Sequence, residues 1–145
     1  MDIRRRFLGN EIRLFPNAFN ADNYLTIEAL EDGLYVSLSN NDCEYCVNGS
    51  NNWITLPAGT NTSTINKGGT LLFRGVLIPN SSNGIGTFTV NKQFNLKGNC
   101  MSMLYGNYAS FSETISYEYA FRRLFKGCST LKSVSNNFLP AKSIA

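Results

Sequence analysis

Thr70-Leu-Leu-Phe-Arg-Gly-Val-Leu-Ile78 is the most strand-like run of the chain. Its aliphatic, aromatic and β-branched side chains fit the half-buried surface of a β-sheet. Gly75 interrupts the run and predicts a bulge or a close approach of another backbone. A polar connection ending at Lys67-Gly-Gly69 precedes the run, and the loop 79–84 follows it. The middle of the chain therefore predicts a β-strand bounded by turns.

Further strand-like runs lie at short intervals on both sides, separated by turns rich in Asn, Asp and Gly. They cover residues 24–30, 34–39, 43–47, 53–56, 85–90 and 94–96. Short strands at this spacing are typical of a β-sandwich. The whole chain of 145 residues has the size of one compact domain with a small appendage. We therefore expect a mainly β protein whose residues 23–110 form a small Ig-like antiparallel β-sandwich.

The periodicity of the apolar residues changes near residue 117. The apolar side chains now recur at intervals of three and one, which is one face of an α-helix, and Gly127 is a natural C-terminal stop. The residues of this face are Tyr117, Ala120, Phe121, Leu124, Phe125 and Cys128. A turn and a short extended piece follow, so residues 111–145 predict a helix–strand unit.

Residues 1–22 alternate basic and apolar side chains and are too short to hold a core of their own. Because exposed apolar side chains tend to be buried against a neighbour, we expect a docking tail. It would bind either its own domain or another subunit. The candidate contacts in this tail are Arg4, Arg5, Arg6, Phe7, Leu8 and Phe15.

Several function classes are excluded or disfavoured by composition. The chain has no histidine, which removes Ser-His-Asp and Cys-His catalysis and His-ligated zinc. The formal net charge of +3 is too small for a dedicated nucleic-acid-binding protein. No carboxylate lies between Glu44 and Glu113, and the earlier acids, including Asp32, are typical of solvated turns and strand ends. We therefore expect no enzyme activity, no catalytic residue, no cofactor and no metal, with a weak local calcium site at Asp32 or Asn40-Asn41-Asp42 as the alternative.

Four cysteines stand at positions 43, 46, 100 and 128. Cys43 and Cys46 form a CxxC pair, but the other two do not provide the second close pair of a zinc ribbon. In an alternating strand, positions 43 and 46 point to opposite faces. We expect buried or half-buried, apolar thiols, with a metal site or a disulfide as alternatives.

The N-terminus does not predict a secretion signal, since Glu11 and Arg13 interrupt any apolar stretch after Arg4-Arg5-Arg6. No apolar run approaches the 18 residues of a membrane-spanning helix. These features predict a protein that is made and kept in the cytoplasm and has no membrane span.

The last part of the chain resembles a known repeat. Tyr119-Ala-Phe-Arg-Arg-Leu-Phe-Lys-Gly-Cys-Ser-Thr-Leu-Lys-Ser-Val-Ser-Asn-Asn-Phe-Leu-Pro140 is similar to a unit of the BspA-like leucine-rich repeats, which run through Phe-x-Gly-Cys and x-x-Leu to Leu-Pro. The upstream part resembles the domain that precedes such repeats in surface proteins of gut bacteria and in phages that infect them. The matching strings are Tyr24-Leu-Thr-Ile-Glu-Ala-Leu-Glu-Asp-Gly33, Cys43-Glu-Tyr-Cys46, Gly84-Ile-Gly-Thr-Phe88 and Gly98-Asn-Cys-Met-Ser-Met-Leu104.

This resemblance, over about residues 23–140, implies a non-enzymatic adhesion or recognition module: an Ig-like sandwich followed by a partial leucine-rich-repeat-type unit. Such repeats need several stacked units, because one unit cannot cover its own apolar face. The sequence holds one such unit, so we expect either that the protein continues or that a partner or the sandwich covers that face. We expect assembly contacts through Phe121, Leu124 and Phe125.

Together with the missing secretion signal, the resemblance favours a phage virion component that assembles in the host cytoplasm. It would be a head fibre, decoration or tail-associated attachment protein. The expected partners are further copies of the chain in a homo-oligomer and other virion or surface proteins. The alternative is an adhesin on the bacterial cell surface or a carbohydrate-binding module.

A host-surface glycan is a further expected partner, since aromatic faces stack on sugar rings. Aromatic residues make up 12% of the chain. The candidate glycan contacts are Tyr45, Trp53, Tyr105 and Tyr108. For Trp53 the alternative is a place in the core of the sandwich.

Overall fold

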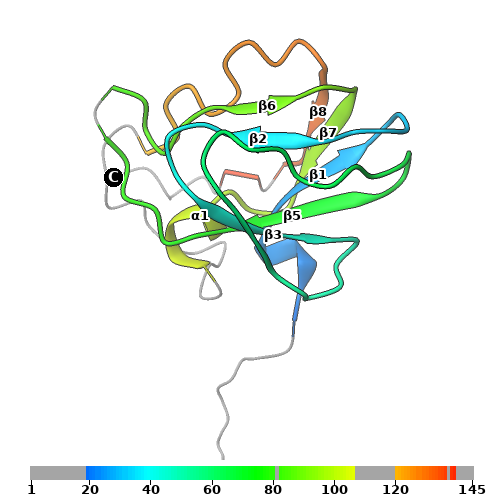
Figure 1. Cartoon of the computed structure of the whole chain (residues 1–145), viewed down its shortest axis with the longest axis horizontal. Coiled ribbons are helices and arrows are strands. Elements are labelled where there is room, and N and C mark those ends of the chain that lie inside the picture. The colour runs from blue at the N-terminus through cyan, green and yellow to red at the C-terminus, as the bar shows by residue number, and fades with distance from the viewer. Residues whose placement is uncertain (1–18, 81, 107–119, 137, 140–145) are drawn as a thin grey trace, which may run out of the picture.

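The computed structural model describes residues 19–80, 82–106, 120–136 and 138–139, and it is mainly β (Figure 1). A short 3₁₀-helix, η2 (Ala21–Asn23), and one turn of α-helix, α1 (Ser102–Tyr105), are its helical elements within those ranges. The strands are β1 (Leu25–Ala29), β2 (Val36–Leu38), β3 (Cys43–Val47), β4 (Ile54–Leu56), β5 (Thr70–Arg74), β6 (Phe88–Val90), β7 (Phe94–Lys97) and β8 (Leu131–Val134). The mainly β class predicted from the strand-like runs is confirmed.

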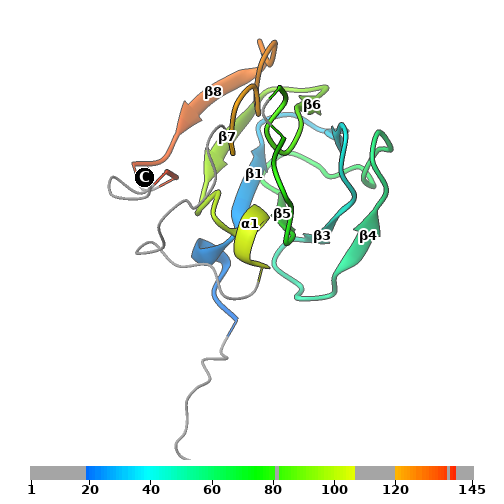
Figure 2. The same ribbon diagram turned by 90° about the vertical axis from the view of Figure 1, so that its left-hand side faces the viewer.

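The strands form two sheets. Six of them make one mixed sheet in the order β4-β3-β5-β1-β7-β8, and β2 pairs with β6 in a second sheet. All neighbours are antiparallel except β7 and β8, which run parallel. Figure 2 shows the strands of the large sheet following one another along a curve from β8 to β4, with β6 above β5 and β3. The large sheet therefore ends in β4 on one side and in β8 on the other.

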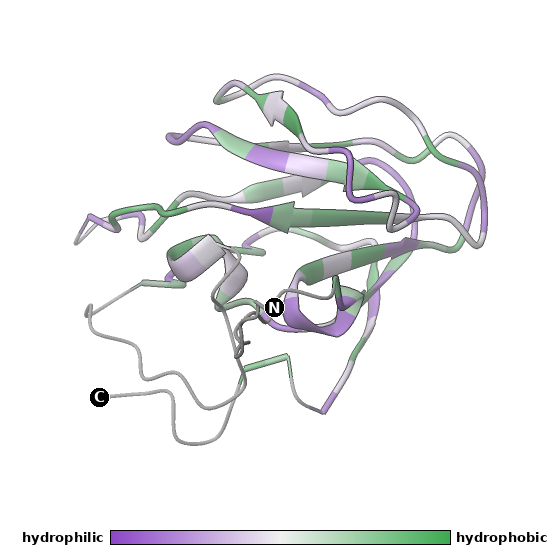
Figure 3. Ribbon diagram, turned by 90° about the horizontal axis from the view of Figure 1, so that it is seen from below, coloured by the Kyte–Doolittle hydropathy of each residue, from purple (hydrophilic) through white to green (hydrophobic). Residues whose placement is uncertain are grey.

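The core lies between the two sheets, because strand alternation sends every second side chain inward. From the large sheet come residues such as Ile27 and Phe73, and from the small sheet Leu38 and Phe88, all of which are almost completely buried. Phe73 and Phe88 meet edge to face with their ring centroids 5.1 Å apart. Figure 3 shows apolar residues concentrated in the strands and hydrophilic residues in many of the turns.

The run 70–78 leaves the sheet earlier than its composition predicts. β5 ends at Arg74, and the next N–H groups of the run bond to another part of the chain. Gly75 donates to the carbonyl of Ser102 at 2.9 Å, and Leu77 donates to the carbonyl of Met103 at 3.1 Å. The second half of the run therefore lies along α1 as an extended segment, and α1 itself has no counterpart among the predicted elements.

The predicted helix is wrong over residues 120–128. This segment forms turns, and Arg123 has a positive φ of 60°. In an α-helix the carbonyl of Leu124 would accept from the N–H of Cys128. Here it accepts from the N–H of Phe88 at 2.7 Å. The segment uses its carbonyls to hold the edge of the small sheet, so its apolar spacing does not produce a regular helix.

The C-terminal segment packs against the core of the same chain. Leu124 is buried, and Phe125 stacks on Phe88 with centroids 5.3 Å apart. Phe121 is half-buried and packs against the same cluster. The three residues expected to form assembly contacts therefore lie against their own sheets, and β8 joins the large sheet. Of the two ways of covering the apolar face of this unit, the structure has the intramolecular one.

The predicted docking tail is described only from residue 19 onward, so Arg4, Arg5, Arg6, Phe7, Leu8 and Phe15 lie outside the described residues. The described end of the tail packs against its own domain. Phe19 stacks on Tyr24 with centroids 5.5 Å apart, and Ala21 packs against the same outer cluster of the large sheet. Within the described ranges, no helix is long and apolar enough to cross a membrane.

All four cysteines are free thiols, and Cys43, Cys46 and Cys100 are buried. The half-buried thiol of Cys128 donates to the carbonyl of Phe88 at 3.1 Å. No group of three or more metal-ligating side chains gathers in the part of the chain that the structure describes. The prediction of buried or half-buried thiols is thus confirmed at all four positions.

Two of these thiols are expected to resist alkylation in the folded protein. Burial, with smaller contributions from Asp42 and Glu44, raises the pKa of Cys43 to about 12. Burial also raises the pKa of Cys100 to about 12. At pH 8 the thiolate fraction of such a group is roughly a thousandfold smaller than that of a thiol with a pKa near 9.

Peptide mapping after iodoacetamide treatment measures this protection, with a urea-unfolded sample as the control. We expect labelling of Cys43 and Cys100 in the unfolded sample and almost none in the native one. Equal labelling rates in the two samples would contradict the burial of these side chains.

Candidate binding surface

The outer face of the large sheet carries a second, smaller apolar cluster. Cys46 and Leu72 are paired across β3 and β5, and both point away from the main core with Tyr24. Trp53, immediately before β4, lies half-buried against this cluster, and its ring centroid is 4.9 Å from that of Tyr24. The tryptophan therefore belongs neither to the main core nor to a freely exposed surface.

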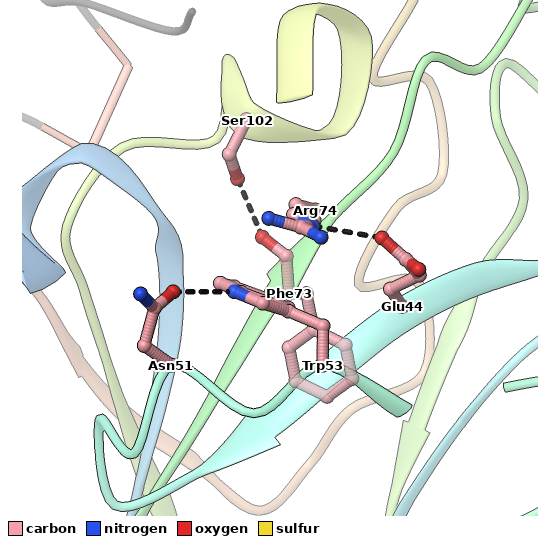
Figure 4. A network of polar contacts seen from close by, with 6 residues as sticks. All are labelled: Glu44, Asn51, Trp53, Phe73, Arg74 and Ser102. Atoms are coloured by element: carbon pink, nitrogen blue, oxygen red, sulfur yellow. Dashed lines mark hydrogen bonds and ion pairs between the residues drawn. The ribbon is translucent and has the colours of Figure 1, made fainter. Parts of the chain in front are cut away.

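Arg74 connects this cluster to the neighbouring strand. Its Nε donates to Oε1 of Glu44 at 2.7 Å, and its guanidinium lies over the ring of Trp53, 4.1 Å from the centroid (Figure 4). The Trp53 indole N–H donates to Oδ1 of Asn51 at 2.8 Å. The β3–β5 register places Glu44 directly opposite Arg74, so the ion pair follows from strand pairing.

This arrangement fixes the arginine more than it stabilises the fold. The side chains of Arg74 and Glu44 are 19% and 42% exposed, and ion pairs at such partly exposed positions contribute about 0–1 kcal/mol. Stacking on an indole adds a comparable amount and restricts the guanidinium. Burial raises the pKa of Tyr24, and the nearby charge of Arg74 opposes that rise.

An open groove of about 420 Å³ lies beside Arg74. Its lining comes from the strands β3, β4 and β5, from the segment after β5 and from the end of α1. The residues that line it are Asp42, Cys43, Glu44, Thr55, Arg74, Gly75, Val76, Leu77, Tyr105 and Gly106. Its chemistry is mixed: aliphatic and aromatic carbon next to two carboxylates and one guanidinium.

The segment after β5 carries the most exposed large apolar side chains of the described residues: Val76, which lines the groove, and Ile78, two residues further along the chain. Val76 is 78% exposed and Ile78 is 73% exposed. Because the segment is extended, these two side chains point to the opposite side from Leu77, which packs against the core. The bonds from Gly75 and Leu77 to α1 hold this backbone in place. We call Val76 and Ile78 the apolar ridge.

The candidate glycan contacts are scattered. Tyr45 is buried in the core, and its hydroxyl oxygen accepts from the N–H of Ser63 at 3.1 Å, so its ring has no free face for a sugar. Trp53 contacts Arg74 and Tyr24, as described. Tyr105 is half-buried and lines the groove. Tyr108 lies outside the described residues. Of the four candidates, the structure thus links Trp53 and Tyr105 to the region of Arg74: Trp53 contacts Arg74, and Tyr105 lines the same groove as Arg74.

The apolar ridge was not among the predicted site residues. Val76 and Ile78 belong to the most strand-like run of the sequence, so their composition predicts burial rather than exposure. Gly75 was the local signal that the run changes character at this point. A second hollow, of about 640 Å³, lies at the turn 64–70 next to β3, and polar and backbone groups dominate its lining. It has no comparable apolar ridge.

No protein-family model, no curated protein sequence and no solved structure shows significant similarity to the chain.

Proposed function

We propose that this protein is a non-enzymatic structural and attachment component of a phage virion that acts through protein–protein contacts. In the particle it would be a head fibre, a decoration protein or a tail-associated protein, assembled in the host cytoplasm with other copies of itself and with other virion proteins. A glycan on the host surface would be a further partner. The alternative proposal is an adhesin on a bacterial cell surface or a carbohydrate-binding module.

The apolar ridge is the observation that carries the assembly role. Large aliphatic side chains that are about three quarters exposed raise the free energy of the protein in water, and their burial in an interface lowers it. Full burial of a Val or Ile side chain is worth about 1.5–3 kcal/mol. Val76 and Ile78 are two residues apart on a backbone that hydrogen bonds to α1 hold in place, so a partner that covers both gains several kcal/mol from their burial. The groove beside them offers the shape for an inserted side chain.

The same region supports a protein partner better than a sugar. A sugar-binding platform needs an aromatic face open to solvent. The ring of Trp53 is covered by the guanidinium of Arg74 and contacted by Tyr24. Tyr45 is buried. The most exposed carbon of the region is aliphatic, which suits the apolar anchors of another protein.

Beyond the mainly β class, we propose that the fold is an Ig-like sandwich followed by a leucine-rich-repeat-type unit. Two features support it. The two sheets share a core in the manner of a sandwich. The C-terminal segment adds β8 in parallel to β7, and parallel neighbours are the rule in stacked repeats of helix or turn and strand. The turns at residues 120–127 would take the place of the repeat helix.

The double substitution Val76→Ser and Ile78→Ser tests the assembly role. We expect the variant to fold with a free energy of unfolding within about 0.5 kcal/mol of the wild type, because both side chains are largely exposed. Its content in purified particles, measured by quantitative mass spectrometry, should fall at least tenfold.

Val134→Ser is the matched control. Val134 is 50% exposed on β8, at the opposite end of the large sheet from β4, and its substitution should leave incorporation unchanged. Normal incorporation of the ridge variant would contradict the assembly role of the ridge. Absence of the wild-type protein from the particles would refute the virion proposal as a whole.

A further inference from the structure

We infer that the groove beside Arg74 binds residues 4–8 of a second copy of this chain, Arg-Arg-Arg-Phe-Leu. We call residues 4–8 the basic arm. This inference rests on the proposed assembly role and names the partner segment. Each copy would donate its arm to one neighbour and accept the arm of another, so the contact is head to tail.

The groove has the chemistry of a receptor for a basic and apolar peptide. Asp42 and Glu44 contribute two carboxylates, and the single cation, Arg74, is already held by Glu44 and by the ring of Trp53. The lining therefore carries a net charge of minus one. The lining also contains Leu77, Tyr105 and Val76, and Val76 continues into the rest of the apolar ridge at Ile78.

The side chains of the basic arm complement those of the lining in charge and in hydrophobicity. Arg4, Arg5 and Arg6 supply guanidinium groups, which bind carboxylates through charge-assisted hydrogen bonds. Phe7 and Leu8 supply an aromatic and an aliphatic side chain for the apolar ridge and the ring of Tyr105. Complementary charge also favours the correct register of the arm and speeds encounter between copies.

The chain has enough length to reach a neighbouring molecule. Ten residues separate Leu8 from Phe19, and Phe19 is fixed by stacking on Tyr24. An extended chain covers about 3.3 Å per residue, so this linker can span roughly 35 Å. That distance is about the diameter of a domain of this size. The arm can therefore reach the groove of an adjacent copy.

Two variants of the full-length chain test the inference by complementation. The arm variant carries Arg4→Glu, Arg5→Glu and Arg6→Glu, and the groove variant carries Val76→Ser and Ile78→Ser. The arm variant keeps an intact groove, and the groove variant keeps an intact arm. We expect each alone to self-associate at least tenfold more weakly than the wild type in sedimentation velocity. A 1:1 mixture should form a heterodimer that does not grow further, because one donor and one acceptor remain.

A charge-matched control carries Lys67→Glu, Lys126→Glu and Lys132→Glu, three exposed positions away from the groove lining. It changes the net charge by the same amount and should self-associate like the wild type. Self-association of the arm variant at wild-type strength would overturn the inference and leave the assembly role standing. Failure of the mixture to form heterodimers would also overturn it. A wild-type protein that stays monomeric at all concentrations would refute both the self-assembly in the proposed function and the inference.

Discussion

Replacement of Gly98 by alanine is expected to abolish cooperative folding or to lower the free energy of unfolding by more than 4 kcal/mol. Gly98 follows β7 and has a φ of 76°. A Cβ built there would lie 1.9 Å from the carbonyl oxygen of Tyr24. That oxygen belongs to the backbone next to β1 and accepts hydrogen bonds from the N–H of Asn99 and the hydroxyl of Thr26. The clash therefore cannot be relieved by moving a side chain, and such severe effects are rare among single substitutions.

Gly59→Ala is the matched control for this prediction, because Gly59 has the same φ of 76° and no heavy atom within 4 Å of the position of the new Cβ. It should cost only about 1 kcal/mol, which is the strain of a left-handed backbone in an L-residue. Urea unfolding followed by circular dichroism measures both variants. Similar losses for the two glycines would mean that strain alone, and not the approach of β1, decides the effect at Gly98.

Phe88→Ala is expected to destabilise the protein by about 3–5 kcal/mol, the usual cost of emptying a fully buried aromatic site. Phe88 is 1% exposed and lies between Phe73 and Phe125, with centroid distances of 5.1 and 5.3 Å. The loss should appear in urea unfolding at any protein concentration. Phe88→Leu, which keeps most of the volume, should cost less than about 1.5 kcal/mol.

The pair Phe88 and Phe125 also tests the intramolecular position of the C-terminal segment. Residues in contact are coupled by about 0.5–3 kcal/mol in a double-mutant cycle. We expect coupling in this range between Phe88→Ala and Phe125→Ala, independent of protein concentration. Additive effects would show that Phe125 does not pack on Phe88, and coupling only at high concentration would assign the contact to a neighbouring copy.

The strands were predictable because their signal is local. Alternation of apolar and polar residues over a few positions, bounded by Asn and Gly, marks a half-buried strand without any knowledge of its neighbours. The predicted run 43–47 coincides with β3, and the run 24–30 contains β1. Burial in these strands follows from the same alternation, as in Leu25 and Ile27, which are fully buried in β1.

In the two segments whose conformation was predicted wrongly, contacts with a distant part of the chain decide the conformation. Val76 and Ile78 are residue types that are common inside strands. However, the N–H groups of Gly75 and Leu77 bond to carbonyls of α1, and this leaves the side chains of Val76 and Ile78 exposed. Residues 120–128 have helical spacing, but the carbonyl of Leu124 bonds to the small sheet. The local sequence does not identify the partners of these three hydrogen bonds, since each partner lies far along the chain.

The candidate site was predictable only in part for the same reason. Trp53 and Tyr105 stand out as aromatic residues in a chain with few charges, and both lie near the groove. Arg74 contacts Trp53 and lines the groove together with Tyr105, and its position depends on the β3–β5 register that sets it opposite Glu44. Register is a property of two strands together. Composition alone therefore names aromatic candidates but does not show that Tyr45 faces the core.

The parallel pair at the end of the large sheet has a consequence for synthesis. β7 precedes β8 by more than thirty residues, and Phe125 and Phe138 are needed to close the core over Phe88 and Phe94. While the ribosome is still making that stretch, β7 is an edge strand and Phe88 and Phe94 lack the rings of Phe125 and Phe138 that later cover the core. Exposed strand edges and apolar surface make such intermediates prone to pair with other chains. We therefore expect the yield of this polypeptide to depend on chaperones and on the speed of translation.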